Sequence, residues 1–534
     1  MTLKENKSLV SSRIKDFLCS ANAYSHDTHN IQCLETHISW IFLTGEFAYK
    51  VKKPVTLGFV DFSTLTLRKH FCEEELRLNR RFAPKIYLEV VTINQVNDVL
   101  TVNGNGPIVD FAVKMRQFSQ AALLSNLCNQ NRLSDDIIDQ MAEKIAHFHL
   151  SLNAIEPLSD SIESVKHSVF SNLEEIQELE YLARESDQLR RIESNTHTQF
   201  SKLIPILKER QKGGFIRDCH GDLHLGNIAN IGGEVTLFDC IEFNEEFRYI
   251  DIICDIAFTL MDLDFRQRTT QANRLLNQYL ELTGDYNGLH LLRFYQIYLA
   301  LVRAKVHLIQ ANQSQSPPSS RSELYHKFKS YLDLAESYFD SSLPVMILMS
   351  GLSGSGKSTI AAQLAYHSGA IRIRSDVERK RLYNLSALDS SSKMTHIDIY
   401  SEAATEDTFA HLQTLVTAIV HAGYSCIVDA TFIRQPQRDD FIQLANKLEC
   451  PIHILYCYAE QATLERRIRQ RALSQRDASE ADISVLYSQI QSQDPFTQEE
   501  RQHLHQIDSE KELDLPHLIN LLGMEQDPKQ HMER

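Results

Sequence analysis

The sequence predicts two domains, an α+β domain with two lobes followed by an α/β domain with a parallel sheet. Its 534 residues exceed what one hydrophobic core accommodates, since domains average about 150 residues. In the N-terminal part strands come first and helices later, which is the order of an α+β fold. From about residue 343 strands and helices alternate, which is typical of a parallel sheet with helical crossovers.

The clearest seam between the two parts is "ANQSQSPPSSRSE", residues 311–323. It is polar and contains Pro317-Pro318, which cannot continue a helix. A helix is expected after it, followed by a short apolar strand. We therefore place the first domain at 1–343, including the linker and helix of 311–343, and the second at 344–534.

Within the first domain, residues 38–53 predict two strands around a turn at Thr44-Gly45. Further elements are expected in chain order: a helix over 66–82, strands over 86–114, helices over 134–210 and helices again from about 251.

The second domain opens on "GLSGSGKS", which fits the phosphate-loop pattern G-x-x-x-x-G-K-[ST]. An apolar strand over 345–350 precedes it and the helix-forming run "TIAAQLAYH" follows it. Backbone N–H groups of such a loop surround phosphate, the lysine neutralises phosphate charge, and the serine hydroxyl ligates Mg²⁺. The residues expected to bind nucleotide are Gly351, Ser353, Gly354, Ser355, Gly356, Lys357, Ser358 and Thr359. The alternative is a glycine-serine loop without a ligand.

Two carboxylates follow apolar strands of this domain. Asp429 ends "YSCIVD", where a ligand of the magnesium shell is expected, and Asp376 is predicted at the end of the second strand. Asp376 could accept the proton of an acceptor hydroxyl. Each could instead cap a helix.

The run "LERRIRQR" places Arg467 and Arg471 on one helix face, where they could stabilise transferring phosphate. A solvated helix face is the alternative. Residues 343–500 resemble small P-loop kinases of the gluconate, shikimate and polynucleotide kinase type. The resemblance implies transfer of a phosphoryl group from ATP, with the two arginines in a lid.

In the first domain, "HGDLHLGNIANIGGEVTLFD" spans residues 220–239. Asp222 can orient or accept the proton of an attacking hydroxyl, and Asn227 can reach a divalent cation. The glycine pair 232–233 predicts a hairpin that returns Asp239 to the side of Asn227, where both can share magnesium. Alternatives are a structural turn and a zinc site, although neither cysteines nor a helical histidine pair completes a zinc shell.

The lysine that anchors ATP should lie upstream on a strand, paired with a glutamate of a helix. "FAYK" supplies Lys50, and "CEEELRLNRRF" supplies Glu73 and Glu75. Lys52 lies on the same strand face as Lys50 and competes with it. An ordinary exposed lysine is the alternative for either.

"HGDLHLGN", "LFDCIEF" and "DIICDIAF" resemble the aminoglycoside phosphotransferase and choline kinase family, whose fold is protein-kinase-like. The resemblance covers about residues 30–310. It implies the following roles: Asp222 as catalytic base, Asn227 and Asp239 as magnesium ligands, Lys50 on the ATP phosphates, Glu75 (or Glu73) as its partner, and Asp255 as a structural residue. The order of the two halves is similar to bacterial proteins that fuse such a domain to a P-loop kinase. The sequence departs from the pattern because no glycine-rich loop precedes Lys50.

The net charge of −15 argues against a nucleic-acid partner. The ten cysteines form no CxxC pair, no secretory signal is readable, and the apolar runs are too short to span a bilayer. A cytoplasmic enzyme without membrane contact is therefore expected.

The predicted function is an ATP- and Mg²⁺-dependent, bifunctional phosphotransferase acting on a small-molecule hydroxyl. The alternatives are a nucleotide-binding regulatory protein with one inactive domain, and a polynucleotide 5′-hydroxyl kinase formed by the C-terminal half. The sequence names neither the acceptor nor the oligomeric state.

Overall fold

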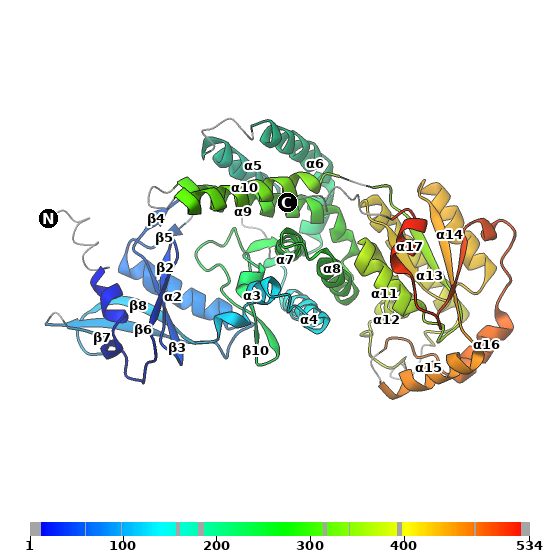
Figure 1. The fold of residues 1–534 in the computed structure, drawn as a ribbon, viewed down its shortest axis with the longest axis horizontal. Coiled ribbons are helices and arrows are strands. Elements are labelled where there is room, and N and C mark those ends of the chain that lie inside the picture. The colour runs from blue at the N-terminus through cyan, green and yellow to red at the C-terminus, as the bar shows by residue number, and fades with distance from the viewer. Residues whose placement is uncertain are drawn as a thin grey trace. The chain divides into compact units, whose positions relative to one another are not determined.

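The computed structural model describes residues 12–58, 60–97, 99–155, 161–179, 186–312, 318–340, 342–391, 398–474 and 477–524 (Figure 1). The chain divides into two compact units, one made of Met1–Ser168 with Leu207–Asp262 and the other of Val169–Ile206 with Leu263–Arg534. The second unit includes helices that precede residue 343, and the division of the chain at that residue stays a prediction.

In the described part of the first unit, six strands form an antiparallel sheet in the order β1-β2-β3-β8-β6-β7. They are β1 (Gln32–Glu35), β2 (Ser39–Leu43), β3 (Phe47–Lys52), β6 (Tyr87–Val96), β7 (Val99–Val102) and β8 (Ile108–Arg116), with the short pair β4 (Thr56–Leu57) and β5 (Val60–Asp61) beside β3 in sequence. β2 and β3 confirm the two predicted strands. Their turn uses Gly45 at φ +109°, a conformation that favours glycine.

The predicted helix after β5 is α2 (Leu65–Asn79). It begins where the Thr64 side chain accepts a hydrogen bond from Leu67 N, as an N-cap does. Arg68 of this helix donates to Asp110 of β8 at 2.8 Å, which ties the helix to the sheet. The consequence for the site is that α2 buries Glu75 beside β3.

The predicted glycine hairpin is also confirmed. β10 (Ile228–Ile231) and β11 (Glu234–Leu237) pair antiparallel around Gly232 and Gly233, which have φ of +62° and +88°. Positive φ at both central residues is the geometry of a two-residue hairpin turn. A second pair, β9 (Ile216–Asp218) with β12 (Tyr249–Asp251), brackets this segment.

Helices fill most of the rest of the first half of the chain, as predicted. They are α3 (Leu124–Asn129), α4 (Asp135–Ser151), α5 (Ser161–Leu179), α6 (Ser186–Lys212), α7 (Ile252–Phe265), α8 (Thr269–Thr283), α9 (Leu289–Asn312) and α10 (Pro318–Ser337). α9 and α10 pack against each other within the second unit. Tyr331 of α10 also stacks on Phe265 at the end of α7, with ring centroids 3.7 Å apart. In the part of the chain that the structure describes, no helix combines the length and apolar character needed to cross a membrane.

A buried polar contact in the second unit predicts a pH-dependent stability. Tyr338 and Gln296 donate to Asp264 at 2.8 and 3.3 Å, and burial raises the pKa of the Asp264 carboxyl to about 7. In the unfolded chain this pKa is about 4, so the folded state holds the proton more tightly. The free energy of unfolding should therefore decrease as pH rises from about 4 through about 7, because the folded state must then carry a buried charge.

Asp264→Asn should flatten this dependence and increase stability at pH 8 relative to the unmodified chain. Urea unfolding at pH 5 and pH 8 measures the difference, with the exposed Asp340→Asn as the matched control. The same pH dependence in the Asp264→Asn chain and the unmodified chain would contradict the assignment.

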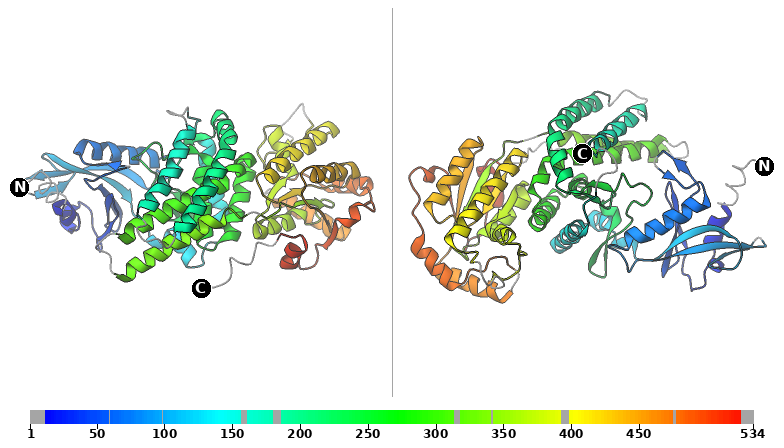
Figure 2. Two further views of the ribbon diagram at one scale, coloured as in Figure 1. Left: turned by 90° about the horizontal axis from the view of Figure 1, so that it is seen from above. Right: turned by 180° about the vertical axis from the view of Figure 1, so that it is seen from behind.

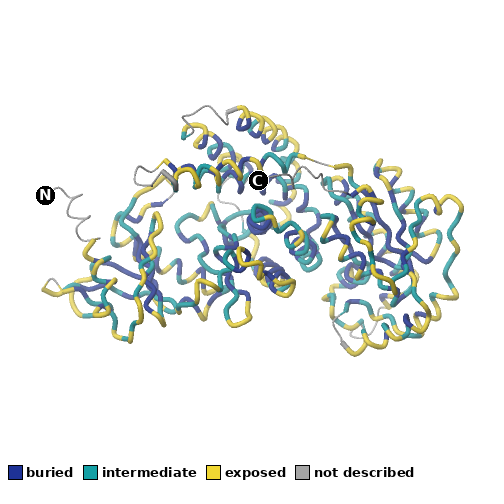
Figure 3. The backbone as a smooth tube through the Cα atoms, in the orientation of Figure 1, coloured by how far each residue is buried: buried dark blue, intermediate teal, exposed yellow. Residues whose placement is uncertain are grey.

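The described part of the second unit also contains a five-stranded parallel sheet in the order β14-β15-β13-β16-β17. The strands are β13 (Met346–Ser350), β14 (Ile371–Arg374), β15 (Cys426–Asp429), β16 (Ile452–Tyr458) and β17 (Leu504–Asp508). Helices cover both faces of the sheet (Figure 2), and its central strands are buried (Figure 3). The described helices of this part of the chain are α11 (Lys357–Ser368), α12 (Ser375–Leu382), α13 (Glu402–His421), α14 (Gln435–Lys447), α15 (Gln461–Ser474), α16 (Ile483–Ser492) and α17 (Leu515–Leu521). This confirms the predicted α/β domain.

One predicted position differs. β14 ends at Arg374, and Asp376 lies in the first turn of α12 rather than at the end of the strand. Arg374 is still extended, and the helix begins at the next residue. Acidic residues in the first turn favour this start, because they suit the positive end of the helix dipole.

Candidate active sites

The segment after β9 is held in place by one buried carboxylate. Asp255 of α7 accepts hydrogen bonds from His220 N at 3.0 Å and Gly221 N at 2.9 Å, and it contacts the His149 ring at 3.0 Å. Gly221 has φ +84°, and a Cβ there would lie 2.6 Å from Phe247 O. Asp255 thus shapes the turn that presents Asp222.

Asn227 orients Asp222. Its Nδ2 donates both to the carbonyl oxygen and to Oδ2 of Asp222 at 2.9 Å. Phe238 N donates to Asn227 O at 3.0 Å, so the hairpin returns the chain to Asn227 as predicted. Asp239 follows directly, at φ +61°, a conformation uncommon for a residue other than glycine and frequent at functional sites.

Lys50 joins this group from the antiparallel sheet. Its Nζ lies 2.6 Å from Asp239 Oδ1 and 2.9 Å from Glu75 Oε1. Burial alone would lower the pKa of Lys50, but Asp239 and Glu75 raise it well above its ordinary value. Lys50 in turn lowers the pKa of Asp239, although burial opposes this. A lysine cation and two carboxylates from three separate segments therefore meet at one point.

The geometry distinguishes the two candidate glutamates, Glu73 and Glu75, whereas both candidate lysines pair with carboxylates. Glu75 is fully buried between Lys50 and Lys52, whose Nζ lies 2.8 Å from Glu75 Oε2. Lys52 also pairs with Glu242, which is buried. Glu73 is exposed and lies 3.7 Å from Lys69. Of the two lysines, Lys50 is the one that pairs with Asp239 in the described part of the chain, whereas Lys52 pairs with Glu75 and Glu242.

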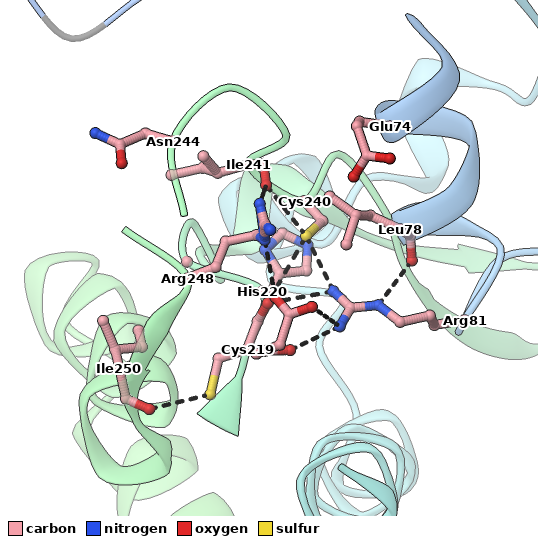
Figure 4. A network of polar contacts seen from close by, with 12 residues as sticks. Glu74, Leu78, Arg81, Cys219, His220, Cys240, Ile241, Asn244, Arg248 and Ile250 are labelled. Carbon is pink, nitrogen blue, oxygen red and sulfur yellow. Dashed lines mark hydrogen bonds and ion pairs between the residues drawn. The ribbon is translucent and has the colours of Figure 1, made fainter. Parts of the chain in front are cut away.

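Two arginines, Arg81 and Arg248, hold the chain on either side of this turn (Figure 4). Arg81, in the turn that follows α2, donates to the carbonyl oxygens of Asp218 and Cys219 at 2.7 and 3.3 Å. Arg248 donates to Asp218 Oδ1 at 2.8 Å and to Ile241 O at 3.1 Å. No sequence pattern predicted this role for either arginine, because their partners are mostly backbone carbonyl groups.

The His220 ring also serves the loop. Its Nε2 lies 2.9 Å from Phe238 O, and burial lowers its pKa. The His224 ring accepts from Gly226 N at 3.0 Å. Both rings therefore stabilise the turn in which the carboxylates lie.

The phosphate loop connects β13 to α11 through three glycines with positive φ, Gly351, Gly354 and Gly356. A Cβ on Gly351 would lie 2.2 Å from Cys457 O, so the loop requires glycine there. Lys357 Nζ donates to Leu352 O at 2.8 Å, which folds the side chain over the loop. Burial lowers the pKa of Lys357.

The remaining loop residues lie beside Lys357 and at the start of α11. Ser355 is buried within 3.4 Å of Lys357 Nζ, and Ser358 and Thr359 are in the first turn of α11, where free N–H groups favour anions. Ser353 N donates to Gln489 Oε1 of α16 at 2.8 Å. A phosphate oxygen that used this N–H would replace Gln489, and no sequence pattern pointed to that residue.

Ser358 and Asp429 fit a divalent cation. Ser358 Oγ donates to Asp429 Oδ1 at 3.2 Å, while Asp429 Oδ2 is buried without a hydrogen-bond partner in the described structure. An unpaired buried carboxylate oxygen is costly unless a cation binds it, and Mg²⁺ prefers oxygen ligands. Burial raises the pKa of Asp429, and the positive charges of Arg372 and Arg374 oppose this.

The two predicted lid arginines of α15 have different partners. Arg467 donates to Gly354 O at 3.2 Å and to Ser509 Oγ at 2.8 Å, so it contacts the phosphate loop. Arg471 donates to Ala481 O. Asp376 lies in the first turn of α12, and its charge opposes the larger effect of burial, which lowers the pKa of Lys357.

Comparison with known families identifies two segments of the chain. Residues 108–295 match the Phosphotransferase enzyme family, and residues 346–496 match an AAA domain. The chain thus consists of a phosphotransferase-family segment followed by an AAA P-loop segment, the predicted order. The two matches support a kinase-type phosphotransferase.

Similar proteins cover most or part of the chain. An uncharacterized protein of Mycobacterium tuberculosis (strain ATCC 25618 / H37Rv) is 29% identical over 478 residues, which is 89% of this chain and 93% of that protein. A choline/ethanolamine kinase family protein from Mesorhizobium loti is 11% identical, covering 61% of this chain and 99% of its own, with a TM-score of 0.37. A sugar kinase from Janibacter sp. HTCC2649 is 19% identical, covering 36% of this chain and 100% of its own, with a TM-score of 0.26.

Proposed function

We propose that the chain is a bifunctional, ATP- and Mg²⁺-dependent phosphotransferase that moves the γ-phosphate of ATP to the hydroxyl of a small molecule. The observation that carries the proposal is the convergence of Lys50, Asp239, Asn227 and Asp222 from β3 and from the two sides of the glycine hairpin. A second, separate nucleotide site is proposed at the phosphate loop.

At the first site, Asp222 accepts the proton of the acceptor hydroxyl. Asn227 holds its carboxylate in one orientation, which leaves the Asn227 amide oxygen free of that hydrogen bond. Lys50 binds nucleotide phosphates, and Asn227 with Asp239 would hold Mg²⁺. Bound Mg²⁺ neutralises the charge that develops on the transferred phosphoryl group.

At the second site, Lys357 and the loop N–H groups bind phosphates, and Ser358 with Asp429 would hold Mg²⁺. Arg467 is already seated on the loop at Gly354, where a cation stabilises transferring phosphate. Arg471 lies one helical turn further along α15, and Asp376 is the proposed base for the second acceptor. The net charge of −15 supports small acceptors rather than nucleic acid, and a cytoplasmic location is proposed with them.

The test is phosphorylation of a mixed library of small hydroxyl compounds by the full chain, with transfer of the labelled γ-phosphate as the measurement. ADP release should require an acceptor. The same rate without any acceptor would favour a regulatory or ATPase role, and labelling of 5′-hydroxyl oligonucleotides alone would favour a polynucleotide kinase.

Removal of divalent cations gives a further expected result. Excess EDTA should abolish acceptor phosphorylation, since both proposed sites use carboxylate or amide oxygens that suit Mg²⁺. Added Mg²⁺ should restore the rate. Phosphorylation that continues at the same rate in EDTA would contradict the metal assignment.

A further inference from the structure

A carboxylate on α8 contacts two arginines of β14. Glu281 Oε2 lies 3.0 Å from Arg372 Nη2, and Glu281 Oε1 lies 3.0 Å from Arg374 Nη1. All three residues belong to the second compact unit and are largely shielded from solvent, with side-chain exposures of 14%, 8% and 17%. Buried charges need partners, so Glu281 is a counter-charge for both cations, and Arg374 has a second one in Asp477, whose Oδ1 lies 2.7 Å from Arg374 Nη2.

The two arginines reach the phosphate-loop site. Arg372 Nη1 donates to the carbonyl oxygen of Ser358 at 3.1 Å. Arg374 pairs in register with Asp429 across the parallel strands β14 and β15, so their side chains leave the same face of the sheet. Arg372 therefore lies beside Ser358, and Arg374 lies beside Asp429. Glu281 pairs with both arginines and so contacts a cation next to each proposed metal-binding residue.

Glu281 lies in the phosphotransferase-family segment, whereas the arginines lie in the AAA segment. α8 also docks on the edge strand β14 without charge. Asn277 Nδ2 donates to Ala370 O at 3.1 Å, and Arg372 N donates to Asn277 Oδ1 at 2.8 Å. The helix thus provides two separable contributions, a hydrogen-bonded attachment and a counter-charge.

We propose that Glu281 is a positioning residue of the phosphate-loop site, which holds Arg372 and Arg374 and offsets their charge beside Ser358 and Asp429. Through them it sets the affinity of the site for the divalent cation that accompanies nucleotide. The nucleotide site of the AAA segment is therefore completed by a residue of the phosphotransferase-family segment. This inference rests on the proposed nucleotide binding at the phosphate loop.

The experiment titrates Mg²⁺ into the full chain at a fixed concentration of fluorescent ADP. The part of the binding signal that is lost in Lys357→Ala is assigned to the phosphate-loop site. Glu281→Gln should raise the apparent Mg²⁺ dissociation constant about tenfold, because Asp477 remains as a partner of Arg374 only and the added net positive charge opposes a divalent cation. Arg374→Gln should shift the constant in the opposite direction. Asn277→Ala, the matched control, should lower the thermal midpoint without changing the Mg²⁺ constant.

Shifts of opposite sign in Glu281→Gln and Arg374→Gln support the proposal. An unchanged Mg²⁺ constant in Glu281→Gln, or an equal change in Asn277→Ala, overturns it while leaving the proposed function in place. If Glu281→Gln does not fold, Arg374→Gln decides, because a constant that rises or stays unchanged in that variant also overturns the proposal. If the unmodified chain shows no binding that depends on Lys357, the proposed function of this site fails as well.

Discussion

Replacing Asp222 by asparagine is expected to lower acceptor phosphorylation at the first site by about 10²–10⁴-fold, the range that a general base contributes. The substitution removes the group that takes the hydroxyl proton. It should leave the loop intact, because Asn227 Nδ2 can donate to the new amide oxygen as it does to Asp222 Oδ2. Transfer of labelled phosphate to the acceptor, measured in a Lys357→Ala background that silences the second site, gives the rate.

The control is Glu234→Gln, which removes an exposed carboxylate from the same hairpin next to its turn. It breaks an exposed ion pair with Lys144 at 2.8 Å and should change the rate little, since such pairs contribute about 0–1 kcal/mol. Nucleotide binding and the thermal midpoint should stay near the unmodified values in both variants. A rate in Asp222→Asn equal to that in Glu234→Gln would rule out Asp222 as the base.

The hairpin that positions Asp239 could be predicted because its cause is local. Two consecutive glycines between apolar strands specify a tight turn, and the turn fixes where the following residue returns. The phosphate loop was predictable for the same reason, since its three glycines with positive φ lie close together in the sequence, between a strand and a helix.

The pairing of Lys50 and Lys52 could be predicted only in part. Strand periodicity places both on one face, and it gives no reason to prefer either. The structure separates them by their second partners, Asp239 for Lys50 and Glu242 for Lys52, which lie 189 and 190 residues further along the chain. Contacts over such separations follow from the packing of the whole unit and leave no local pattern.

The roles of Glu281 and Gln489 could not be predicted from the sequence, for a related reason. Glu281 is an ordinary charged residue of an amphipathic helix until α8 packs against β14. Gln489 has no distinctive neighbours, and it becomes relevant because α16 brings its amide to Ser353 N. The sequence therefore predicts the residues that carry the chemistry better than those that hold them.

Lys357→Ala is expected to weaken nucleotide binding at the phosphate loop by about 10²-fold, because charge-assisted hydrogen bonds of this kind contribute about 1.5–3 kcal/mol each. The same substitution should stabilise the nucleotide-free protein. Burial lowers the pKa of Lys357, so the folded chain holds this proton less tightly than the unfolded chain does. The resulting cost to stability is greatest at low pH and lessens as pH rises toward the ordinary pKa of lysine.

Binding of fluorescent ADP and the thermal midpoint without nucleotide, measured on the same samples, test both effects. Lys447→Ala is the matched control, because Lys447 is an exposed lysine at the end of α14 and its removal should change neither quantity. A residue that only supports the fold would lose stability and binding together. Lys357→Ala should instead lose binding while its midpoint rises, since functional sites retain groups that are costly to bury. A lower midpoint together with unchanged binding would show that the lysine is structural and that the loop holds no phosphate.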